Sequence, residues 1–103
     1  MQIIRCLSEM ISEELGDAKN YIVKAQEWRD SQPSTADLFY RLSEEEMEHA
    51  SKLHEEVSRV IAEYRRSEGD PPPEMQAVYN YLHKKQIDKA GKIKAMQAMY
   101  NER

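Results

Sequence analysis

The 103-residue sequence has few of the residues that build disulfide frameworks, turns and sheets. It has a single cysteine, Cys6, so neither an internal disulfide nor a cysteine-based metal site is available. Glycine occurs three times and proline four times, while Val, Ile and Thr rarely alternate with polar residues as they do in strands. Helix-forming residues dominate instead. The sequence therefore predicts an all-α protein with a single domain over residues 1–103.

Positive charge and long apolar runs are also scarce. The net charge is −4, which disfavours a general nucleic-acid binder and suits a protein that binds cations. No run approaches the roughly 20 apolar residues of a membrane span, and Ser and Glu interrupt the first apolar stretch, unlike a signal peptide. We expect a cytoplasmic protein with no membrane or nucleic-acid partner; residence inside a protein compartment stays open.

Three amphipathic stretches predict three helices, because their apolar residues recur in steps of three and four. These helices cover about residues 2–30, 34–68 and 74–101. Ser34 is expected to cap the second helix after a short turn, which predicts an antiparallel hairpin. Gly69 and residues 71–73, all proline, separate the third helix, because they cannot continue the helical hydrogen-bond pattern. The third helix has a less regular apolar face, so its docking site is not predicted.

Three ionisable side chains interrupt the two apolar faces expected inside the hairpin: Glu14 in the first helix, and Glu46 and His49 in the second. Burying a carboxylate without a partner is costly, so a bound metal ion would explain these residues. The other members of the first face are Ile4, Leu7, Ile11, Ala18, Tyr21, Ala25 and Trp28; those of the second are Phe39, Leu42, Leu53, Val57, Val60 and Tyr64.

Helix geometry predicts that the three ionisable residues meet. At a rise of ~1.5 Å per residue, Glu14 lies roughly 24 Å from the turn, and Glu46 and His49 lie roughly 18 and 22 Å from it. Glu46 and His49 are three residues apart, so a carboxylate oxygen and an imidazole nitrogen can bind one ion. Several carboxylates with open positions favour Fe, although Mn and Zn accept the same ligands.

The chain contains only half of a dinuclear carboxylate site. Such a site in a helical bundle takes a Glu from each of two helices and a Glu-x-x-His pair from each of two others. In the third helix the only histidine is His83, and Asn80 stands three residues before it. We therefore expect a second copy to supply the missing half, so that a homodimer forms a four-helix bundle. A larger homo-oligomer stays open.

Two segments resemble the first half of rubrerythrins and other ferritin-like proteins, most of all the half-length encapsulated ferritins. They are ELGDAKNY at 14–21 and LFYRLSEEEMEHA at 38–50, and the resemblance covers about residues 7–60. It implies that Glu46 bridges two irons, that Glu14 and His49 bind one iron each, and that Tyr21 lies just outside the ligands. It also implies a ferroxidase, which oxidises Fe(II) to Fe(III) with dioxygen for iron storage or detoxification.

Two features depart from these relatives, and other readings stay open. The rubredoxin-like cysteine cluster of rubrerythrins is missing, and KAMQAMYNER at the end does not resemble the Gly- and Leu-rich targeting peptide of encapsulin cargo. An encapsulin-type shell therefore stays open as a partner, although the sequence shows no targeting tail. The alternative to a ferroxidase is a non-catalytic helical interaction protein whose Glu and His residues satisfy each other. A third reading is an enzyme with manganese or a mixed-metal centre.

Overall fold

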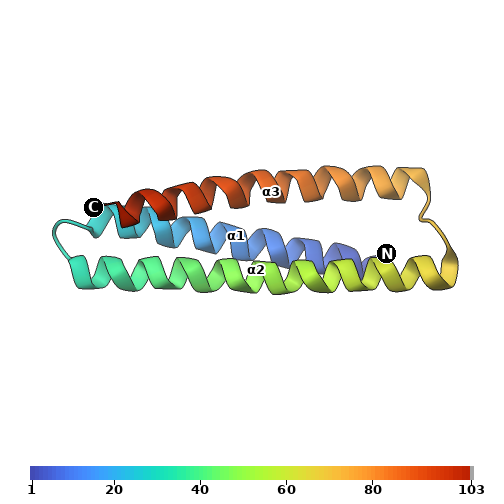
Figure 1. The fold of residues 1–103 in the computed structure, drawn as a ribbon, viewed down its shortest axis with the longest axis horizontal. Helices are drawn as coiled ribbons and strands as arrows, with labels where there is room; N and C mark the ends of the chain where they lie inside the picture. Colours follow the sequence, from blue (N-terminus) through green and yellow to red (C-terminus); the bar gives the residue numbers. More distant parts are fainter. Residues whose placement is uncertain (103) are drawn as a thin grey trace.

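The computed structural model of the protein describes residues 1–102 and consists of three long helices. They are α1 (Gln2–Trp28), α2 (Pro33–Glu68) and α3 (Pro73–Asn101). Successive helices run in opposite directions, and α1 lies between α2 and α3 in the view of Figure 1. Over these residues there is no strand, so the predicted all-α class is confirmed.

The two connections follow from the residues that interrupt the helices. Pro33 occupies the first position of α2, where its missing N–H costs nothing. The prediction that Ser34 caps this helix is wrong, because Gln32 precedes the proline and no side chain caps the helix end. Gly69 ends α2 with φ +81° and ψ −164°, a backbone conformation that is essentially restricted to glycine.

Small residues of α2 line the contact between the two helices of the hairpin. Ala36, Ser43 and Ala50 recur every seven residues, which is nearly two helical turns, and all three are buried. The Ser43 hydroxyl donates a 2.7 Å hydrogen bond to the main-chain oxygen of Ala18 in α1. A side chain this short can reach the neighbouring backbone only where the two helices approach closely.

The buried stripe overlaps the faces predicted from the sequence only in part. In α1, Leu15 and Ile22 are buried, whereas Trp28 is 46% exposed. The expectation that the predicted faces fill the interior is confirmed for Leu7, Ile11, Ala18, Ala25 and Val57, which are buried, and is wrong for Trp28. Several residues of the predicted faces instead border a partly exposed strip of the hairpin, which we call the open flank. By helical spacing it comprises Ile3, Met10, Glu14, Tyr21 and Trp28 of α1, and Leu38, Leu42, His49, Leu53 and Val60 of α2.

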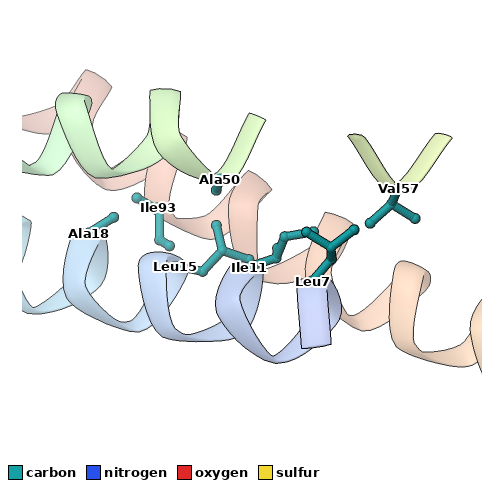
Figure 2. Packing of buried hydrophobic residues seen from close by; sticks show 7 residues of the cluster. All are labelled: Leu7, Ile11, Leu15, Ala18, Ala50, Val57 and Ile93. Atoms are coloured by element: carbon teal, nitrogen blue, oxygen red, sulfur yellow. The ribbon is translucent and has the colours of Figure 1, made fainter. Parts of the chain in front are cut away.

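The main core joins all three helices. Figure 2 shows side chains from the three helices meeting in it. They are Leu7, Ile11, Leu15 and Ala18 of α1, Ala50 and Val57 of α2, and Ile93 of α3. The third helix packs mainly against α1 and touches α2 at few points.

Polar contacts fix the carboxyl-terminal half of α3 to the hairpin. The Gln97 amide donates to the Ser43 hydroxyl at 2.9 Å, and the Gln26 amide donates to the main-chain oxygen of Met96 at 3.3 Å. The Tyr100 ring is stacked on that of Tyr40, with centroids 5.0 Å apart. The end of α3 is therefore anchored beside the turn between α1 and α2.

The molecule is elongated, with extents of 55 × 18 × 17 Å and a radius of gyration of 16.5 Å. A compact domain of this length would have a radius of gyration of about 13 Å. The accessible area is 7061 Å², against about 6,000 Å² for a compact monomer of this mass. The single chain thus exposes more surface than its size requires. Within residues 1–102, no helix is both long and apolar enough to cross a membrane.

Candidate metal centre

Three potential ligands meet on the open flank, halfway along the hairpin. Glu14 comes from α1, and Glu46 and His49 come from α2; their ligand atoms all lie within 4.8 Å of one another. The His49 Nδ1 atom lies 3.4 Å from Oε2 of Glu14 and 3.6 Å from Oε2 of Glu46. The structure therefore brings together the three residues that the sequence analysis selected as ligands.

The positions of these side chains follow from their neighbours in sequence. Glu14 precedes the buried Leu15, and His49 precedes the buried Ala50. Each step along an α-helix turns the side chain by about 100°, so a residue next to a core position lies at the edge of the buried stripe. The core contacts of the hairpin thus hold both ligands at the border between interior and open flank.

The burial of the two carboxylates is unusual because no Lys or Arg offsets it. The side chains of Glu14 and Glu46 are 26% and 20% exposed, and that of His49 is 53% exposed. Within residues 1–102, His49 is the sole ion-pair partner of either carboxylate. Oε2 of Glu14 is buried and accepts no hydrogen bond from the described residues, although His49 Nδ1 is near. A buried acceptor without a donor is rare in folded proteins, and a cation would satisfy it.

The donor set fits a transition-metal ion. Two carboxylate groups and an imidazole nitrogen are ligands that Fe, Mn and Zn accept. Metal bonds of roughly 2.0–2.2 Å bring donor atoms to within roughly 3–4 Å of one another, so small rotations of these side chains would complete the cluster. Three protein ligands leave positions open for water or a substrate. The single chain does not contain the four Glu and two His of a dinuclear centre.

Tyr21 and His83 make ring contacts with residues other than the three ligands. Tyr21 is half-buried, and its ring is stacked on that of Phe39 with centroids 6.3 Å apart. No hydrogen bond joins Tyr21 to a candidate ligand within residues 1–102, so its place just outside the ligands stays a prediction. His83 is stacked on His54, a pairing between α2 and α3 that the sequence analysis did not anticipate, because the docking of α3 could not be predicted.

The assignment of a function rests on the geometry of this ligand cluster. Its chemical features are two partly buried carboxylates, one imidazole and a buried carboxylate oxygen that accepts no hydrogen bond from the described residues, all on a partly exposed apolar flank. The protein-family models, the curated proteins and the solved structures that were compared with this chain contain no match.

Proposed function

We propose that the protein is a ferroxidase of the ferritin-like type, which oxidises Fe(II) to Fe(III) with dioxygen at a di-iron site between two subunits. The observation that favours a metal most strongly is the buried Oε2 of Glu14, which accepts no hydrogen bond from the described residues and lies beside a second carboxylate and His49. Carboxylate-rich sites with open positions favour iron, and iron storage or detoxification would be the purpose of the reaction.

The open flank supports a second subunit as the source of the missing ligands. It exposes Ile3, Met10, Trp28 and Leu38 to between 42% and 51%, on the same side of the hairpin as the ligands. A twofold axis through this flank would pair two identical hairpins into a four-helix bundle. The pair would hold two copies of Glu14, Glu46 and His49, which is the ligand set of a dinuclear carboxylate centre. It would also cover part of the surplus exposed area.

Each ligand has a defined task in this proposal. Two Fe(II) ions held together supply two electrons to one O2, which takes up two protons to give hydrogen peroxide. The Glu14 and Glu46 carboxylates stabilise the higher charge of the ferric product, and Glu46 is the residue expected to bridge the pair. His49 binds through a nitrogen lone pair, which requires the neutral imidazole, so iron affinity should fall when this residue is protonated.

The second candidate function is a non-catalytic helical interaction protein. The observation that favours it is the position of His49 Nδ1, which lies within 3.6 Å of both carboxylates. A protonated His49 could neutralise one of the two carboxylates without any metal. This function would still use the apolar open flank, but it requires no stoichiometric metal and no reaction with oxygen.

Mixing metal-free protein with one equivalent of Fe(II) in air-saturated buffer separates these functions. A ferroxidase should give a rapid rise in Fe(III) absorbance, well above the rate in buffer alone. Prior addition of redox-inactive Zn2+ should suppress it, because Zn2+ accepts the same ligands. An oxidation rate equal to that of buffer, with or without Zn2+, would rule out the ferroxidase and leave the interaction protein.

A further inference from the structure

The amino-terminal half of α3 is hydrogen-bonded to α1 through the Gln86 side chain and to α2 through the Gln76 side chain, but it is not packed closely along its length. Two grooves flank α3 in this region, one of about 390 Å³ between α2 and α3 and one of about 860 Å³ beside the start of α1. Met75, Val78 and Leu82 are between 36% and 60% exposed, although Met75 and Leu82 lie on the side of α3 that faces the hairpin. Few contacts connect α3 to α2.

A stack of aromatic rings bridges α2 and α3 at this point. The imidazoles of His54 and His83 are nearly parallel, with centroids 4.7 Å apart and an interplanar angle of 12°. The Tyr79 ring is also nearly parallel to His83, at 5.7 Å and 9°. No hydrogen bond or ion pair within residues 1–102 involves either imidazole. At this level, stacked rings make the contact between α2 and α3.

Few charged residues lie near the stack, where they could offset the positive charge of a protonated imidazole. Glu48 of α2 and Lys94 of α3 line the same groove, to which α1 contributes only Ile11 and Leu15. The charged residues around the second groove, beside Tyr79, are Arg5, Glu9 and Glu13 of α1 and Glu74 of α3, with Arg65 of α2 also acting on Tyr79. None of the carboxylates among them lies within 4 Å of an imidazole nitrogen of the stack.

We propose that the His54–His83 stack is a pH-sensitive clasp, which holds the amino-terminal half of α3 on the hairpin at neutral pH and releases it in mild acid. One charged imidazole can still stack on a neutral ring, as cations do on aromatic faces. Two charged imidazoles at 4.7 Å repel each other. Release therefore follows the second protonation.

The direction of the pH effect follows from His83. Burial, and then the charge on His54, lower the pKa of His83 from its ordinary value of 6.5. The docked form thus binds protons less readily than the released form, in which the ring is solvated. The stabilisation from docking is complete above pH 6.5 and is lost as pH falls through the lowered pKa.

The segments on either side of the amino-terminal half of α3 would permit its release from the hairpin. Four residues, 69–72, connect it to α2 and lie outside both helices. Gly91 stands inside α3 just before the buried Ile93, and a glycine in a helix interior weakens it by about 1 kcal/mol relative to alanine. The carboxyl-terminal half would stay in place through Gln97 and Tyr100.

Hydrogen–deuterium exchange on the metal-free full chain at pH 7.5 and pH 5.0 tests the clasp, after correction for intrinsic exchange. We expect protection of residues 74–90 to fall by about tenfold in acid, since each pH unit between the pKa of the released imidazole and the lowered pKa of the docked one changes the equilibrium by up to tenfold per proton. Protection of residues 93–101 should change little. Equal loss in both halves would indicate general unfolding and would overturn the proposal.

The matched variant is His83→Phe, which keeps an aromatic ring at the stack and removes the titrating group. It should keep residues 74–90 protected at pH 5.0. The variant His54→Phe makes the same test from the other helix, so the result does not depend on one variant folding, which circular dichroism would establish. An acid response in both variants equal to that of the wild type would show that these histidines do not control docking.

Discussion

Replacing Glu46 with Gln is expected to lower Fe(II) affinity by about 100-fold or more and to abolish rapid oxidation. Even groups that only orient metal ligands contribute about 10–100-fold to affinity, and Glu46 is proposed as a ligand to both irons. The substitution keeps the shape of the side chain while removing its charge. Anaerobic Fe(II) titration followed by exposure to oxygen would measure affinity and oxidation in the same sample.

The neighbouring Glu45→Gln is the matched control. Glu45 is exposed and lies outside the ligand cluster, but its substitution changes the net charge by the same amount. It should leave affinity and oxidation within about twofold of the wild type, since long-range effects of one exposed charge are screened. Similar losses in both variants would mean that iron responds to the overall acidity of α2, and the ligand role of Glu46 would be wrong.

Replacing Glu14 with Leu should stabilise the metal-free protein while it abolishes iron binding. The carboxylate is largely buried, one of its oxygens has no donor, and Glu46 is close by. Replacing poorly compensated buried charges with apolar groups of similar volume is neutral or stabilising by 1–4 kcal/mol in other proteins. We expect a gain of about 1–2 kcal/mol here, because Glu14 is partly exposed. Chemical denaturation in the presence of a chelator would measure it.

The control for this substitution is Glu13→Leu, at the exposed neighbouring position. It should change the free energy of unfolding by no more than about 0.5 kcal/mol. If Glu14→Leu destabilised the protein by more than about 1 kcal/mol, the Glu14–His49 contact would be a structural ion pair. That result would favour the non-catalytic interaction protein, because the carboxylate would then be kept for stability and not for metal.

The parts of the structure that depend on local sequence could be predicted. The apolar spacing and the breaks at Pro33 and Gly69 place the three helices, because helix periodicity and proline and glycine act locally. The level at which Glu14 meets Glu46 and His49 follows from the helix rise and the short turn. The candidate ligand cluster was therefore predictable from residue counting within an antiparallel hairpin.

The rotation of the helices and the position of α3 depend on packing, and the sequence pattern did not predict either. The heptad of Ala36, Ser43 and Ala50 determines which face of α2 meets α1, because small residues permit the closest approach. Most of the larger apolar residues of α2, from which its buried face was predicted, lie beside this stripe. The stack of His54 on His83 brings together residues 29 positions apart on different helices, which no local pattern reveals.

Native mass spectrometry of the protein under anaerobic conditions, with one Fe(II) added per chain, tests the interfacial site most directly. The proposal predicts that iron appears on species with two chains, or an even number of chains, at one iron per chain. Species with a single chain should hold much less iron, because each contains only half of the ligands of a dinuclear centre. Single chains that hold iron as fully as the dimers, or dimers without iron, would contradict a di-iron site formed between two subunits.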